Sequence, residues 1–270
     1  MNLIKSKRDK YRGKYSSLAK GERGQIVNLS APIGEGARSA VGEISRRGKK
    51  AAFTLAEVLI TIGIIGVVSA LTIPTLMAKI TEKQTVTKLR ATQSILYRAI
   101  KLAEDEEGDP SCWGLNMDAS EGDAKIIAKK MKKYLKIAID CGTSDTNGMC
   151  IPNDDYKKLS GGNQANYATM NHMYKVKLLN GTSVFFRSRY PEEQNSNNIF
   201  YFFVDTNGKN PPNTFGIDLF AFTYNPENNG LIPAGSKDFK TTGCFGENSI
   251  GLGCAYYVLQ TGKMDYLKRK

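Results

Sequence analysis

The sequence has very little of the chemistry on which most enzymes and zinc sites depend. It contains a single histidine, His172, and no two of its five cysteines are spaced as a CxxC pair. A zinc site needs several His or Cys ligands at short spacing, and a Cys–His nucleophile pair would have to use this one histidine. The sequence therefore excludes the usual zinc proteins and cysteine proteases, and we expect no enzyme activity and no catalytic residue.

A uniformly basic body is also lacking, although the formal net charge is +12. Residues 1–52 hold 13 Lys and Arg against 4 Asp and Glu, whereas the rest of the chain holds 25 against 22. The excess positive charge thus lies in the N-terminal residues 1–52, so a nucleic-acid-binding domain is not indicated. Residues 1–52 also lack an apolar period and are rich in Gly, which predicts a flexible basic leader.

Charge is missing altogether from residues 58–78, a run of 21 residues. A transmembrane helix needs about 20 apolar residues, and we place the span at about 55–78. Lys and Arg that precede a span stay on the cytoplasmic side, which puts the leader inside and the remainder outside. A signal peptide cut after Val68-Ser69-Ala70 is the alternative. The apolar character continues past Ala70, which favours the span.

The stretch AFTLAEVLITIGIIGVVSALTIPTLMAKI resembles the prepilin-type N-terminal segment of type IV pilins and type II secretion pseudopilins. Phe53, Thr54, Leu55 and Glu57 match its motif. The resemblance implies that a prepilin peptidase cuts between Ala52 and Phe53 and then methylates the new amine of Phe53. Two features depart from the family: Ala52 replaces the usual Gly before the cut, and the leader is longer than most.

The same resemblance implies roles for two further residues. Glu57, about one helical turn after Phe53, would meet the Phe53 amine of a neighbouring subunit during assembly. Pro74 stands where the family has its helix-bending proline, and proline inside a helix removes a hydrogen bond and clashes with the preceding turn. We therefore expect Pro74 to kink the helix or to melt it locally.

The implied function is that of a structural subunit of a bacterial type IV pilus-like or type II secretion pseudopilus filament. Its partners would be other pilin-like subunits in a homo- or hetero-polymer, the prepilin peptidase and an inner-membrane assembly platform, with no nucleic acid required. The protein would move from the inner membrane, as a single-pass precursor, into a cell-surface or periplasmic filament. The alternatives are a secreted binding protein with a signal peptide, and a binding protein or enzyme with a single membrane anchor.

Beyond the span, apolar residues recur at three- and four-residue spacings, which predicts that one helix runs over about 53–106. The residues on this face are Val86, Leu89, Leu96, Ala99, Ile100 and Ala103. We expect the rest of the chain, 107–270, to form a globular head with a short helix over 123–138, a hairpin turning at Asn180-Gly181, and strands at 199–205 and 219–224. The predicted fold is α+β and type IV pilin-like, with the long helix packed on a three- to four-stranded antiparallel sheet.

The loop at 205–218 carries several oxygen-bearing side chains, of which Asp205, Asn207, Asn213 and Asp218 are candidate ligands. Calcium takes 6–8 oxygen ligands, and some major pseudopilins bind it in a comparable loop. The loop lacks the closing Glu of an EF-hand. The alternative is a turn held together by its own hydrogen bonds, with no metal bound. Calcium is the only cofactor that the sequence suggests.

All five cysteines follow the span, on the side where disulfides persist. The local candidate pairs are Cys141 with Cys150 and Cys244 with Cys254, which leaves Cys112 over. Other pairings stay open, because spacing alone does not fix connectivity.

Overall fold

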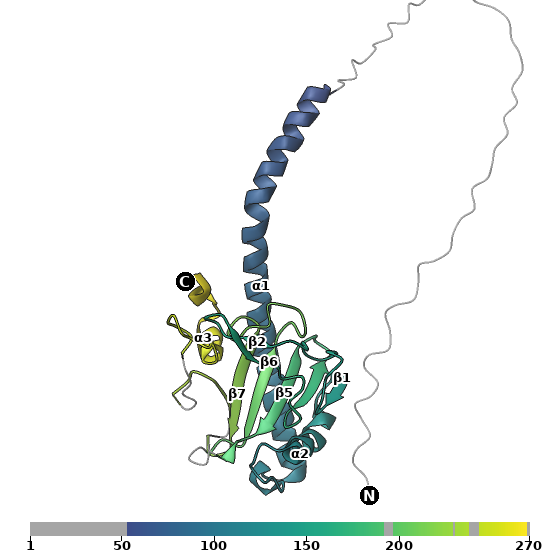
Figure 1. Cartoon of the computed structure of the whole chain (residues 1–270), viewed down its shortest axis with the longest axis vertical. Helices are drawn as coiled ribbons and strands as arrows, with labels where there is room; N and C mark the ends of the chain where they lie inside the picture. Colours follow the sequence, from purple (N-terminus) through teal and green to yellow (C-terminus); the bar gives the residue numbers. More distant parts are fainter. Residues whose placement is uncertain (1–52, 192–196, 229, 238–242, 269–270) are drawn as a thin grey trace, which may run out of the picture. The chain divides into compact units, whose positions relative to one another are not determined.

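The computed structural model describes residues 53–191, 197–228, 230–237 and 243–268 (Figure 1). The expected leader, 1–52, lies outside the described residues. The chain divides into Met1–Phe53 and Thr54–Lys270. The helices of the second unit are α1 (Leu55–Glu107), α2 (Glu121–Met131) and α3 (Cys254–Thr261), with 3-10 turns η1 (Pro110–Cys112), η2 (Lys132–Tyr134) and η4 (Asp265–Lys268).

Helix α1 confirms the long helix that the sequence predicts. It ends because Gly108 takes a positive φ of 79°, where its N–H donates to the carbonyl of Glu104, and Pro110 follows two residues later. All six residues of the predicted apolar face are buried, and every buried residue of α1 lies in its C-terminal half, from Thr85 to Ala103. The helix therefore has one half that packs in the head and one half that does not.

The head is built on one antiparallel sheet of six strands, in the order β1-β4-β5-β6-β7-β8. Its bounds are β1 (Ile137–Gly142), β4 (Tyr174–Leu178), β5 (Ser183–Ser188), β6 (Phe200–Asp205), β7 (Leu219–Asn225) and β8 (Gly230–Pro233). The hairpin between β4 and β5 turns at Gly181, whose φ is 82°, as the Asn-Gly signal predicts. The α+β fold is as expected, with a larger sheet than predicted.

Both faces of this sheet are buried, because alternate residues of a strand point to opposite sides. On one side, Phe186, Phe202 and Phe222 pack with the buried residues of α1 and α2. On the other, Phe185, Phe203 and Tyr167 form a second cluster, in which the rings of Phe185 and Phe203 stack at 5.2 Å. Figure 1 shows α1 lying against the sheet.

The second face is covered largely by the segment between β1 and β4, which supplies Ile151, Tyr156 and Tyr167 to the second cluster. This segment includes two short strands, β2 (Tyr156–Lys157) and β3 (Asn163–Ala165). Lys175 fastens it to the sheet, since its buried Nζ donates to the carbonyls of Thr143 (2.7 Å) and Met170 (2.5 Å). Burial lowers the pKa of Lys175 to about 8. A lysine is tolerated here because the polar backbone groups satisfy its donors.

Three further details differ from the expectation. The helix predicted over 123–138 ends at Met131, and Ile137 already begins β1, where it pairs with Leu178 of β4. Pairing with the β4 edge thus overrides the local helical pattern. Strand β8 and helix α3 were not predicted. With four and eight residues, they are too short to show a clear strand or helix period in the sequence.

We predict that the buried half of α1 carries much of the stability of the head. Leu96 is fully buried in the main core, so Leu96→Ala should lower the free energy of unfolding by about 2–5 kcal/mol. Leu102 lies on the same helix but is 37% exposed, and Leu102→Ala should cost clearly less. Denaturant unfolding of both variants measures the difference. Equal losses would show that the packing of α1 on the sheet is not what stabilises the head.

Candidate functional site: the N-terminal segment and the 205–218 loop

The start of α1 is a reciprocal hydrogen-bonded cap built from Thr54 and Glu57. The hydroxyl of Thr54 accepts from the N–H of Glu57 (3.2 Å), and Oε2 of Glu57 accepts from the N–H of Thr54 (2.8 Å). This is a capping box, which satisfies two donors that a helix start leaves unpaired. The signal was present in the sequence as Thr54-Leu55-Ala56-Glu57 and was missed. The carboxylate that the family resemblance singles out thus already has a partner within its own helix.

The two candidate cleavage residues flank the boundary of the described chain. Ala52 lies outside it, and Phe53 directly precedes the N-cap with 85% of its surface exposed. Cleavage between them would leave the capping box intact, because its backbone donor belongs to Thr54.

Pro74 does not melt the helix. α1 continues through it without interruption, and Figure 1 shows one continuous, curved helix. Of the two expected effects, a kink or local melting, the melting does not occur. The loss of one backbone hydrogen bond is small against the turns on either side, which remain intact.

The first half of α1 is apolar and exposed. Among the described residues, α1 is the one helix long and apolar enough to cross a membrane, and its most apolar window has no buried residue. The exposed residues include Leu59, Ile62, Ile65, Val68 and Ile73. A surface of this kind needs a lipid or protein environment.

The 205–218 loop brings the four candidate calcium ligands together. Asp218 is almost fully buried, and its Oδ2 accepts from the N–H of Asn213 (2.7 Å) and from Nδ2 of Asn207 (3.2 Å). Asp205 is fully buried, and its Oδ2 accepts from the hydroxyl of Tyr156 (2.6 Å). The loop also contacts α1, since Nζ of Lys88 donates to the carbonyl of Thr206.

The polar atoms of the loop are not all satisfied. Oδ1 of Asn207 and Oδ1 of Asn213 are buried without a hydrogen-bond partner, which is costly for an acceptor. Burial raises the pKa of Asp218 to about 6. Burial and the neighbouring Asp218 raise the pKa of Asp205 well above its ordinary value. Two unpaired amide oxygens beside two desolvated carboxylates are groups that a cation would stabilise.

These residues fit calcium in part. Two carboxylates and two amide oxygens supply four of the 6–8 oxygens that calcium takes, and backbone carbonyls of the loop would have to supply others. Against this, Asn207 directs its amide nitrogen, not its oxygen, at Asp218. Asp218 also accepts from the N–H of Thr214 (2.7 Å), as in a turn held by its own hydrogen bonds.

The cysteines form Cys141–Cys150 and Cys244–Cys254 disulfides, and Cys112 is free and exposed. The sulfurs of Cys141 and Cys150 and a carboxylate oxygen of Asp145 lie within 4.8 Å of one another. They offer no thiolate to a metal, because both sulfurs are bonded to each other.

Asp145 has another role, which the sequence did not suggest. Its carboxylate accepts the N–H groups of Met149, Cys150 and Ile151, each at 2.8 Å. It thereby shapes the loop that the first disulfide closes.

Two family matches cover most of the chain. Residues 75–243, more than half of the sequence, match the family of unknown function DUF6613. The chain belongs to this DUF6613 family. Residues 47–73 match the prokaryotic N-terminal methylation motif. No curated protein and no solved structure matches the chain.

The methylation motif bears directly on the N-terminal site. It begins before the candidate cleavage point and ends just before Pro74, so it includes Ala52, Phe53, Thr54 and Glu57. This DUF6613 protein therefore has a prepilin-type segment, as the sequence resemblance predicts, and is a pilin-like precursor. The motif and the apolar half of α1 together indicate a membrane-anchored precursor.

We predict that calcium, if it binds the 205–218 loop, raises the melting temperature of the full chain at pH 7.5 above that in chelator. A ligand that binds only the folded state stabilises it by about 2.7 kcal/mol at a hundred times its dissociation constant. Asp205→Ala together with Asp218→Ala should abolish the difference. Asn213→Gly, which removes one unpaired oxygen at a residue whose φ is already 51°, should reduce the difference. If the unaltered chain melts at the same temperature in calcium and in chelator, the loop is a hydrogen-bonded turn and does not bind calcium.

The pH dependence gives a second prediction. Since the pKa of Asp218 is raised to about 6, above its unfolded value, protonation of this group stabilises the calcium-free fold as pH falls from 7 toward 5. Calcium needs the ionised carboxylate, so its stabilisation should weaken over the same range. Thermal melting at several pH values, with and without calcium, separates the two trends. A calcium effect that is undiminished at pH 5 would place the ion elsewhere.

Proposed function

We propose that this protein is a structural subunit, rather than an enzyme, of a bacterial type IV pilus-like or type II secretion pseudopilus filament. The observation that carries the proposal is the division of α1. Its prepilin-type half is apolar and exposed, whereas its second half packs in the core of the head. A subunit of this form can leave the bilayer and bury the same apolar surface against the helices of its neighbours.

Glu57 would have two successive partners in this account. In the precursor its carboxylate is bound by Thr54. After cleavage, the amine of Phe53 on a neighbouring subunit would become available to it. An ion pair in an apolar surrounding sets register better than it adds stability, which suits a group that must position each incoming subunit.

The capping box allows the two roles to be tested apart. Gln can replace Glu in a capping box, so Glu57→Gln keeps the cap and removes the charge. Thr54→Ala keeps the charge and removes the half of the cap that the Thr54 hydroxyl supplies. If pairing with the amine is the function, filament yield should collapse in Glu57→Gln and in Glu57→Ala, and should fall much less in Thr54→Ala.

Membrane insertion is the control for these variants. All three should insert as well as the unaltered chain, because none of them adds a charge to the apolar segment. Filaments sheared from cells and precursor in membranes are quantified by immunoblot. Normal filament yield from Glu57→Gln would reduce Glu57 to a helix cap and contradict the assembly role.

A further inference from the structure

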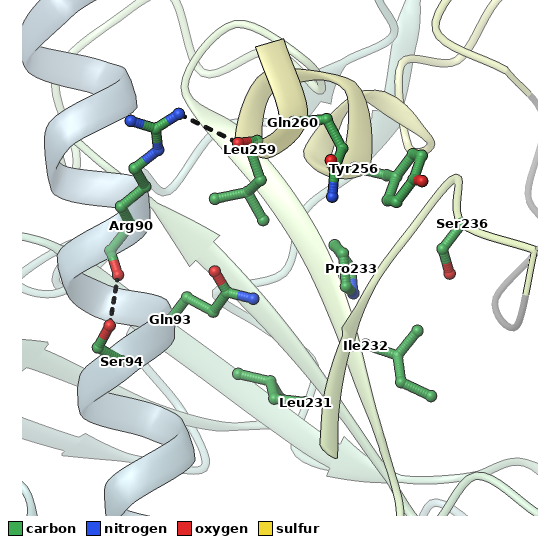
Figure 2. A pocket seen from close by; sticks show the side chains of 10 residues that line it. All are labelled: Arg90, Gln93, Ser94, Leu231, Ile232, Pro233, Ser236, Tyr256, Leu259 and Gln260. Carbon is green, nitrogen blue, oxygen red and sulfur yellow. Dashed lines mark hydrogen bonds between the residues drawn. The ribbon is translucent and has the colours of Figure 1, made fainter. Parts of the chain in front are cut away.

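A groove lies at the edge of the head, between the buried half of α1, strand β8 and helix α3 (Figure 2). Its volume is about 590 Å³, which is within the usual range for small-molecule sites. None of its lining residues belongs to the N-terminal segment or to the 205–218 loop. It is therefore separate from both candidate sites.

The lining has almost no charge to offer a ligand. No carboxylate is present among the described lining residues, and Arg90 is the one cation. Arg90 is already engaged, because its Nη2 donates to the carbonyl of Leu259 (3.1 Å) in the last turn of α3. A cation at a helix C-terminus compensates the helix dipole. The groove is thus unsuited to recognising a charged ligand.

Neutral hydrogen-bonding groups face the groove from two sides. Figure 2 shows Gln93 extending from α1, and Gln260 from α3, toward Pro233 of β8. Neither side chain makes a hydrogen bond within the described part of the chain. Each amide offers two donors and one acceptor oxygen, so the pair can bind groups that both donate and accept.

Apart from Ser94 and Ser236, the remaining lining is apolar and includes one accessible ring. Leu231 and Pro233 come from β8, and Tyr256 at the start of α3 keeps 40% of its surface exposed. An exposed tyrosine presents an apolar ring face with a polar tip. The groove therefore combines a surface for C–H groups with neutral donors and acceptors.

We propose that this groove binds a neutral saccharide, with the ring of Tyr256 against a sugar face and the amides of Gln93 and Gln260 on its hydroxyls. A sugar ring has C–H groups on its faces and hydroxyls, which both donate and accept, around its edge. No enclosed or charged site is needed for such a ligand. The head would then carry a recognition function in addition to its place in a filament.

An extended peptide added to the edge of β8 fits less well. β8 has four residues and ends at Pro233, which has no N–H to donate. Short edge strands that carry proline resist the addition of another strand.

The test uses the full-length protein in a detergent without a sugar headgroup, with maltotriose and chitotriose as probes. Saturation-transfer NMR should detect at least one of them on the protein. Tyr256→Ala, and Gln93→Ala combined with Gln260→Ala, should each weaken binding about tenfold or more. Tyr97→Ala is the matched control, since Tyr97 is 42% exposed on α1 and does not line the groove. It should bind as the unaltered chain does.

Thermal melting verifies that every variant is folded. Failure of both sugars to bind, or binding that survives Tyr256→Ala and the double glutamine variant, would overturn the proposal. Binding of tetra-alanine in the absence of sugar binding would assign the groove to a peptide and overturn it as well. None of these outcomes depends on filament assembly.

Discussion

The structure depends on the packing of one side of α1 against the sheet. Val86, Leu89, Leu96 and Ile100 are buried in the same cluster as the aromatic residues of β5, β6 and β7. This contact exists only in the second half of the helix, because the first half has no polar face and no surface of the head to cover it. One continuous helix thus joins the packed core of the head to an exposed apolar segment.

The head stabilises its sheet on both faces by different means. Helices α1 and α2 cover one face with regular apolar packing. The other face is covered by irregular chain, which is held in place by the Cys141–Cys150 disulfide and by hydrogen bonds that Lys175 and Asp145 make with the backbone. Irregular segments expose many polar backbone groups, so buried charged side chains become useful as their partners. The same logic applies to Asp205 and Asp218 in the 205–218 loop.

The features that could be predicted from the sequence are those with a strong local signal. The apolar period of α1, the Asn-Gly turn and the prepilin-type motif each depend on residues close together in the chain. β1 was misjudged at Ile137, because its strand is defined by pairing with β4, some forty residues away. The role of Asp145 was missed although its partners Met149, Cys150 and Ile151 lie only four to six residues away, because the sequence does not show which backbone groups of a loop a carboxylate will bind. The Thr54–Glu57 cap was readable and was overlooked. In the 205–218 loop, the composition predicted which residues gather, but only the structure shows that two amide oxygens lack partners.

The central claim is that the exposed half of α1 is a processed assembly segment that begins at Phe53. The most direct test is to purify the protein from cells that express the full set of filament genes and to determine its N-terminus by mass spectrometry. The account predicts that the mature chain starts at Phe53 and carries a methyl group on its amine. A chain that starts at Leu71 would show that the apolar run is a signal peptide, and would contradict the account.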